Sequence, residues 1–126
     1  MYRILIAEDE FLLAALIESQ QDVLGHRIIK HVDSGEEAIE SIIELEPDIV
    51  IMDIMLKDHI DGIDAVKKAS ESVDFEVIYT TGNNDPYIKQ RAMETKPLGI
   101  IGKPIEIKQL KSVIDNSHVK RPAQID

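Results

Sequence analysis

The sequence predicts an α/β domain of the doubly wound class, with a five-stranded parallel sheet covered by helices on both faces. Short apolar runs rich in β-branched residues alternate with segments of helical periodicity along the chain. Strands and helices in this alternation form right-handed βαβ units, which build a parallel sheet between two helix layers. The length of 126 residues suits one domain, and the 44% hydrophobic content is sufficient for a core.

Five runs are predicted as strands, at 2–7, 26–32, 48–53, 76–81 and 98–103. Four of them are almost continuously apolar, which is typical of strands covered on both faces. The run 26–32 is more polar, so we expect it at an edge of the sheet.

Helices are predicted between these strands. The first covers 10–24 and stops at Gly25, and the second follows a capping-box pattern at Ser34 and ends before Pro47. Weaker periodicity predicts a helix over 62–71. Asp85 and the proline after it begin a helix that runs to about residue 95, and Pro104 begins the last one. The domain therefore covers 1–117, and we expect the tail 118–126 to fray.

Composition excludes several classes of protein. The chain has no cysteine, so disulfides, thiolate zinc sites and cysteine nucleophiles are ruled out. A formal net charge of −10 opposes direct binding to nucleic acid. No apolar run approaches the ~20 residues of a membrane span, and the N-terminus lacks the pattern of a signal peptide. We therefore expect a cytoplasmic protein that binds neither nucleic acid nor membrane.

Acidic and basic side chains stand where the predicted strands end. Glu8 and Asp9 follow the first strand, Asp53 ends the third, Thr81 ends the fourth, and Lys103 ends the fifth. The carboxyl ends of parallel strands meet at one edge of the sheet, where ligands of doubly wound domains bind. We therefore expect these five side chains to converge.

The charges of this group predict a metal site. Three carboxylates and one lysine leave a net charge of −2, which a divalent cation neutralises. Oxygen ligands without histidine or cysteine favour Mg²⁺ over zinc. A bound magnesium beside a free carboxylate, with Lys103 and the Thr81 hydroxyl opposite, is equipped for phosphoryl transfer to Asp53. The added charge would then draw Thr81 and Lys103 toward Asp53, as in an electrostatic switch.

These residues also match a known family. The motifs ILIAEDE, DIVIMDIML…DG, VIYTTG and GKP occur in this order and at appropriate spacing, and with them the chain resembles the receiver domains of two-component response regulators over 2–117. The resemblance implies a flavodoxin-like fold with strand order 2-1-3-4-5, an order that is known from another receiver. It also implies that a sensor histidine kinase or histidine phosphotransfer protein donates a phosphoryl group in a magnesium-dependent reaction.

The resemblance assigns a role to each matching position. Asp53 corresponds to the phosphoacceptor, Asp9 to a direct metal ligand and Glu8 to a ligand acting through water. The backbone carbonyl of Met55 corresponds to a third metal contact. Thr81 matches the switch hydroxyl.

The lysine motif and its surroundings complete the resemblance. Lys103 matches the lysine that contacts the phosphoryl group, and its bond to Pro104 is expected to be cis. Two features depart from the family pattern. Ile100 stands where members often carry a tyrosine or phenylalanine that reports phosphorylation, and the loop KDHIDG is a residue longer than the commoner version.

The resemblance implies partners without naming them. Besides the phosphodonor, we expect an unknown downstream protein and a phosphorylation-dependent homodimer as an alternative output, with the last two helices and the fifth strand as the surface. No output domain follows in this sequence, so it reads as a stand-alone receiver or as one cut from a larger protein.

Other polar residues receive structural interpretations. Thr80 is expected to pack inward as a β-branched strand residue. Asn83 and Asn84 are expected to serve the turn, with contact of Asn83 to an attacking water as the alternative. The remaining acids and histidines near the motifs are interpreted as solvated or structural: Asp58, Asp61, Asp64, His26, His31, His59 and His118.

Two other functions stay open. One is a magnesium-dependent phosphohydrolase with Asp53 as nucleophile, although Met55 stands where a common hydrolase motif places its second acid. The other is a receiver-like interaction module that is not phosphorylated, an idea that Ile100 sustains. Flavin binding is a less favoured interpretation, because the acidic pair after the first strand would repel the phosphate of a flavin nucleotide.

Overall fold

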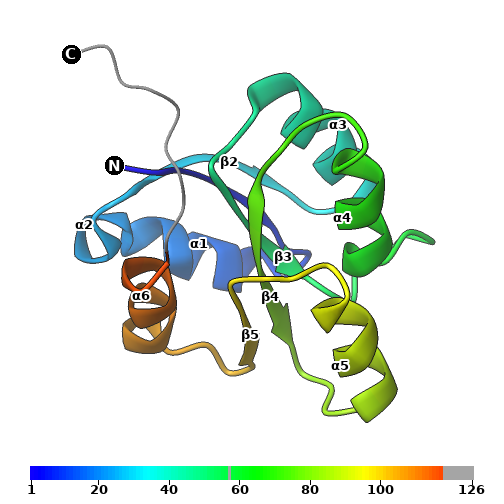
Figure 1. Cartoon of the computed structure of the whole chain (residues 1–126). Helices are drawn as coiled ribbons and strands as arrows, with labels where there is room; N and C mark the ends of the chain where they lie inside the picture. The colour runs from blue at the N-terminus through cyan, green and yellow to red at the C-terminus, as the bar shows by residue number, and fades with distance from the viewer. Residues whose placement is uncertain (57, 118–126) are drawn as a thin grey trace.

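The computed structural model describes residues 1–56 and 58–117, so the predicted tail 118–126 lies outside the described residues. A parallel sheet of five strands runs through the domain in the order β2-β1-β3-β4-β5, which confirms the predicted fold class and strand order (Figure 1). The strands are β1 Arg3–Ala7, β2 Arg27–Val32, β3 Ile49–Asp53, β4 Glu76–Thr81 and β5 Gly99–Gly102. The helices are α1 Phe11–Ser19, α2 Gln21–Leu24, α3 Gly35–Leu45, α4 Gly62–Ala69, α5 Pro86–Met93 and α6 Ile107–Asp115.

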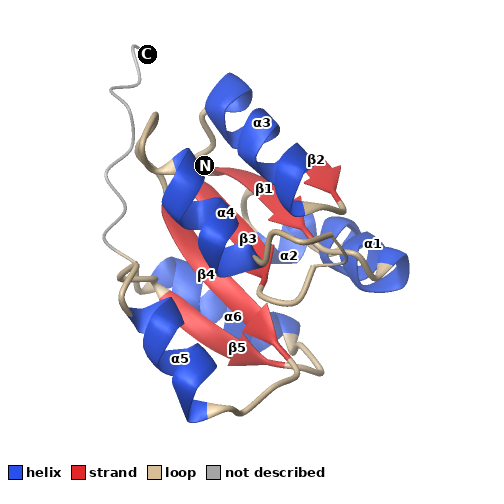
Figure 2. Cartoon of the chain, turned by 90° about the vertical axis from the view of Figure 1, so that its right-hand side faces the viewer, coloured by secondary structure: helices blue, strands red, loops and turns tan. Residues whose placement is uncertain are grey.

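Helices cover both faces of the sheet. Figure 2 shows α3, α4 and α5 in front of the strands and α1, α2 and α6 behind them. Alternate residues of β3 point to the two layers: Val50 and Met52 pack with the first set of helices, Ile49 and Ile51 with the second. All five residues of β3 are buried, as its continuous apolar run predicted, and β2 is an edge strand.

Two predicted helices have different bounds in the structure. The helix expected over 10–24 is interrupted at Gln20, whose N–H donates to the Ile17 carbonyl in a tighter turn before α2 begins. The last helix does not begin at Pro104. Ile105 is instead buried in the core beneath α6, and the extended residue Glu106 serves as the N-cap. The Lys103–Pro104 peptide bond is cis, as expected.

The long β3–α4 loop is fastened to α3. Both Asp58 carboxylate oxygens accept backbone N–H groups at the start of α3, Oδ1 from Gly35 at 3.0 Å and Oδ2 from Glu36 at 3.1 Å. These bonds lower the pKa of Asp58, although burial alone would raise it. Asp58 is therefore a capping residue rather than a merely solvated acid, which the sequence interpretation missed.

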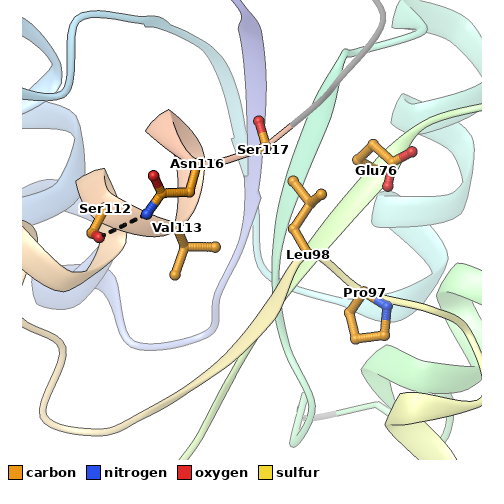
Figure 3. Close-up of a pocket in the computed structure, with 7 residues that line it drawn as sticks. All are labelled: Glu76, Pro97, Leu98, Ser112, Val113, Asn116 and Ser117. Carbon is orange, nitrogen blue, oxygen red and sulfur yellow. Dashed lines mark hydrogen bonds between the residues drawn. The ribbon is translucent and has the colours of Figure 1, made fainter.

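A pocket of about 530 Å³ lies near the amino-terminal ends of β4 and β5, away from the end of the sheet where Asp53 stands. Figure 3 shows its lining: Glu76, Pro97, Leu98, Ser112, Val113, Asn116 and Ser117. Glu76 is the one charged residue of this lining, so the pocket lacks a convergent set of reactive groups. Within the described part of the chain, no helix combines the length and apolarity needed to cross a membrane.

Candidate functional site

Three carboxylates converge at the carboxyl-terminal edge of the sheet. Asp53 is the last residue of β3, and Glu8 and Asp9 follow β1, which pairs with β3 in parallel up to Ala7. One ligand atom from each of the three side chains lies within 4.8 Å of the other two. Glu8 and Asp53 are each only 2% exposed. The predicted convergence of these three carboxylates is therefore present.

Lys103 reaches this cluster from beyond β5, on the other side of β3 from Glu8 and Asp9. Its Nζ lies 3.1 Å from Glu8 Oε1 and 3.0 Å from Asp53 Oδ2. The backbone fixes its position, because the Lys103 N–H donates to the Thr81 carbonyl at 2.8 Å, just beyond the end of β5. The lysine thus forms ion pairs with residues at the ends of both β1 and β3. Its side chain is 18% exposed.

The cluster perturbs the ionisation of its members. The pKa of Glu8 rises to about 7, first because the group is buried and then because of the neighbouring Asp53 carboxylate, while the Glu10 N–H and Lys103 oppose the shift. Burial lowers the pKa of Lys103, but its contacts with Asp53 and Glu8 outweigh this and hold the pKa above its usual value. Glu8 is therefore partly protonated near neutral pH, and a cation that binds its carboxylate must displace that proton.

The donor atoms suit a hard divalent cation. The three convergent side chains offer carboxylate oxygens, and no histidine belongs to the set. When all three carboxylates are ionised, the lysine offsets one of their charges, and one Mg²⁺ neutralises the remaining charge of −2. Met55 is positioned beside these acids, because its N–H donates to Asp53 Oδ1 at 3.0 Å, while its side chain is exposed.

Thr81 ends β4, but its hydroxyl is engaged in the loop that follows and not with the acids. Thr81 Oγ1 accepts the Asn83 N–H at 3.0 Å. Asn83 therefore serves the turn, as expected. Thr80 is paired in register with Asp53 and is 1% exposed, in agreement with its predicted inward packing. Its buried hydroxyl has no hydrogen-bond partner in the described structure.

Two neighbours of the cluster were not recognised in the sequence. Glu10 Oε1 lies 3.5 Å from Lys103 Nζ, and the Glu10 N–H donates to Glu8 Oε2 at 3.0 Å. His31 Nε2 lies 2.8 Å from the Glu8 carbonyl, an acceptor, so this nitrogen donates. The position of Glu10 in the run EDE, directly after Glu8 and Asp9, could have indicated that it lies near the cluster. The position of His31 near Glu8 results from the parallel pairing of β2 with β1, in which His31 stands opposite Ile6.

Comparisons with known proteins decide the family. The model of the response regulator receiver domain matches residues 4–115. The chain belongs to the response regulator receiver family.

The receiver is similar to several curated regulators. It is 29% identical over 113 residues to the transcriptional regulatory protein PdtaR of Mycobacterium tuberculosis, covering 90% of this chain and 55% of that protein. It is 30% identical over 115 residues to the phyllosphere-induced regulator PhyR of Methylorubrum extorquens, covering 90% and 42%. The receiver therefore spans about half the length of these relatives.

Solved structures agree with this assignment. The signal receiver domain of a modulated diguanylate cyclase from Desulfovibrio desulfuricans superposes with a TM-score of 0.83 at 32% identity, covering 91% of both chains. The response regulator domain of Thermotoga maritima CheB superposes with a TM-score of 0.80 at 23% identity, covering 94% of this chain and 98% of that one, and supports the fold alone.

Proposed function

We propose that this receiver is a signalling switch that accepts a phosphoryl group on Asp53, with Mg²⁺ held by Glu8, Asp9, Asp53 and the Met55 backbone carbonyl. The arrangement of Lys103 carries the proposal. Its ammonium group lies 3.0 Å from the Asp53 carboxylate inside a cluster of acids that suits a divalent cation. An ordinary buried ion pair would not require the two further carboxylates, whose repulsion costs stability.

The chain's own residues explain the transfer. An Asp53 carboxylate oxygen bonds to phosphorus while the bond from phosphorus to the donor's leaving atom breaks. Lys103 offsets charge on the phosphoryl oxygens, and bound Mg²⁺ supplies the remaining positive charge. Phosphorylation changes Asp53 from a charge of −1 to one of roughly −2 with new acceptor oxygens. The Thr81 hydroxyl then leaves Asn83 and donates a hydrogen bond to one of these oxygens.

Modification by a small donor tests the proposal. The protein is incubated with Mg²⁺ and acetyl phosphate, and its intact mass is measured. We expect one added, base-labile phosphoryl group in the wild type, none in Asp53→Asn and none when EDTA removes the metal. Asp74→Asn, which neutralises an exposed acid outside the cluster, should label like the wild type.

Two other outcomes would replace the proposal. Persistent hydrolysis of an added phosphate ester, without a modified protein, would favour the phosphohydrolase. Absence of both reactions would favour an interaction module that is not phosphorylated.

The surface next to the site supports a protein as the natural donor, as expected for a histidine kinase or histidine phosphotransfer protein. Helix α1 begins two residues after Asp9, and Phe11 is 72% and Leu12 83% exposed at its start. A donor protein must contact the surroundings of Asp53 to deliver its phosphoryl group, and it would bury these side chains. Isolated exposed apolar residues need no partner, but adjacent ones beside a reactive site favour an interface.

The Leu12→Glu variant tests this docking surface. We expect transfer from a phosphorylated histidine phosphotransfer domain that labels the wild type to slow about tenfold or more, because a buried charge replaces an apolar contact. Labelling by acetyl phosphate should stay unchanged, since α1 contributes no side chain to the acid cluster. Equal slowing with both donors would instead indicate damage to the site, and a change in self-association alone would indicate a second copy of this chain on α1.

A further inference from the structure

Helix α5 is held in place by few apolar contacts. Among its residues only Ala92 is buried, and Ile88 packs against the core as a partly buried side chain. Tyr87 is 67% and Met93 54% exposed. By contrast, α4 on the same face of the sheet buries most of its length (Figure 2). Polar contacts therefore provide a larger share of what positions α5.

Arg91 makes two of these polar contacts. Its Nη1 lies 3.1 Å from Asp61 Oδ2 and its Nη2 lies 3.1 Å from Asp64 Oδ1, with the arginine side chain 23% exposed. Asp61 is the N-cap of α4, and Asp64 lies in its first turn. Asp61 is held rigidly, because its other oxygen caps the helix by accepting the Asp64 N–H at 2.8 Å. A planar guanidinium that binds two fixed carboxylates fixes orientation as well as distance.

The N-terminal end of α4, which Arg91 binds, packs directly against the backbone of Asp53. The Gly62 N–H donates to the Ile54 carbonyl at 2.8 Å. A Cβ atom on Gly62 would lie 2.2 Å from the Asp53 carbonyl oxygen, so only glycine permits this approach. One short path of contacts therefore joins Asp53, the first turn of α4 and the middle of α5.

The N-terminal half of α5 stands over a pocket. It has a volume of about 340 Å³ and is lined by Ile54, Thr81, Asn83, Asn84, Ile88, Lys89, Ile100 and Gly102. An aromatic side chain at position 100 would occupy more of this space than isoleucine does. At the other end of the helix, the Tyr79 hydroxyl lies 2.8 Å from Thr95 Oγ1 and anchors the chain just after α5 to the core. Room for movement thus lies at the N-terminal half.

We propose that Arg91 is a latch, which holds α5 against the first turn of α4 in the position of the unphosphorylated protein and opposes the movement of α5 into this pocket. The proposal rests on the proposed phosphorylation of Asp53. When Thr81 turns toward a phosphoryl group, the Asn83 N–H loses its acceptor, and the loop that carries Asp85, the N-cap of α5, is freed to move toward the sheet. Arg91 is thus a positioning residue, and the latch sets how readily the phosphorylated arrangement forms.

Hydrogen exchange of the unphosphorylated protein tests the hold of the latch. In Arg91→Met we expect the backbone amides of 86–93 to exchange about fivefold faster, because local opening of α5 no longer breaks two charge-assisted hydrogen bonds. Lys67→Met is the matched control. It removes an exposed ion pair between α4 and Glu94, the C-cap of α5, with Lys67 Nζ 3.8 Å from Glu94 Oε1, and should leave exchange unchanged. Arg91→Lys, which keeps the charge but cannot bridge both acids, should be intermediate.

The rate of labelling by acetyl phosphate tests the coupling. A freed α5 reaches the phosphorylated arrangement more often, so Arg91→Met should be labelled about threefold faster than the wild type. Unchanged exchange in 86–93, or an equal rise throughout the protein, would overturn the latch. Faster exchange with slower or unchanged labelling would overturn its coupling to Asp53. If neither protein is labelled, the proposed function fails, whereas the exchange result still decides whether Arg91 holds the helix.

Discussion

Replacing Lys103 with methionine is expected to slow phosphorylation of Asp53 by about 10²-fold or more at saturating Mg²⁺, because a preorganised charge aimed at the moving phosphoryl group is lost. The side chain keeps its length, so the packing around Ile105 should survive. The rate of labelling by acetyl phosphate measures the effect. Lys103→Arg keeps the charge and should retain part of the rate. Lys111→Met, which breaks an exposed ion pair with Asp115 on α6, should label normally.

The same substitution should alter the dependence of stability on pH. The folded-state pKa of Glu8 is about 7 against 4.5 for a free carboxyl group, so between these values the folded protein holds a proton that the unfolded chain has released. The Glu8 contribution to stability is therefore largest below pH 4.5 and falls as pH rises toward 7.

Without Lys103, no cationic side chain of the described residues is paired with Glu8 or Asp53, and the fall should extend to higher pH. In EDTA at pH 8 we expect the variant to be less stable than the wild type by about 2 kcal/mol, and by less at pH 5.5. Urea unfolding at both pH values measures this. An unchanged labelling rate would contradict the role of Lys103 in transfer, and an equal loss of stability at both pH values would contradict the charge argument.

The fold and the acid cluster were predictable because both follow from rules that do not depend on the detailed path of the loops. Continuous apolar runs identify buried parallel strands, and the carboxyl ends of such strands share one edge. Asp53, at the end of β3, and Lys103, just beyond β5, are 50 residues apart in sequence, yet these rules alone bring them together.

Contacts between helices and loops were not predictable in the same way. Arg91 pairs with Asp61 and Asp64 across 30 and 27 residues, and the pairing depends on how far each helix is rotated about its axis. Asp58 caps α3 only because the long β3–α4 loop passes in front of that helix. Position 100 shows the limit differently. The sequence showed that an aromatic side chain is missing at this position. The pocket beside Thr81, which Ile100 helps to line, became apparent only in the structure.

Gly62→Ala is expected to destabilise the protein by at least about 3 kcal/mol, among the larger effects of a single methyl group. The new Cβ would lie 2.2 Å from the Asp53 carbonyl oxygen and 2.8 Å from Met52 Cγ, closer than atoms can approach. Strand β3 is buried along its whole length between two neighbouring strands, so it cannot yield. The start of α4 must therefore move outward, which stretches the bond from the Gly62 N–H to the Ile54 carbonyl.

Urea unfolding in EDTA measures this loss without involving the metal site. Gly82→Ala is the matched control, because no described atom beyond its two chain neighbours lies within 4 Å of the position of its added Cβ. We expect its stability to stay within about 0.5 kcal/mol of the wild type. Equal unfolding midpoints for Gly62→Ala and the wild type would show that α4 can withdraw from Asp53 at no cost. The close contact between them would then be unable to transmit a change at Asp53 to the first turn of α4, where Arg91 binds.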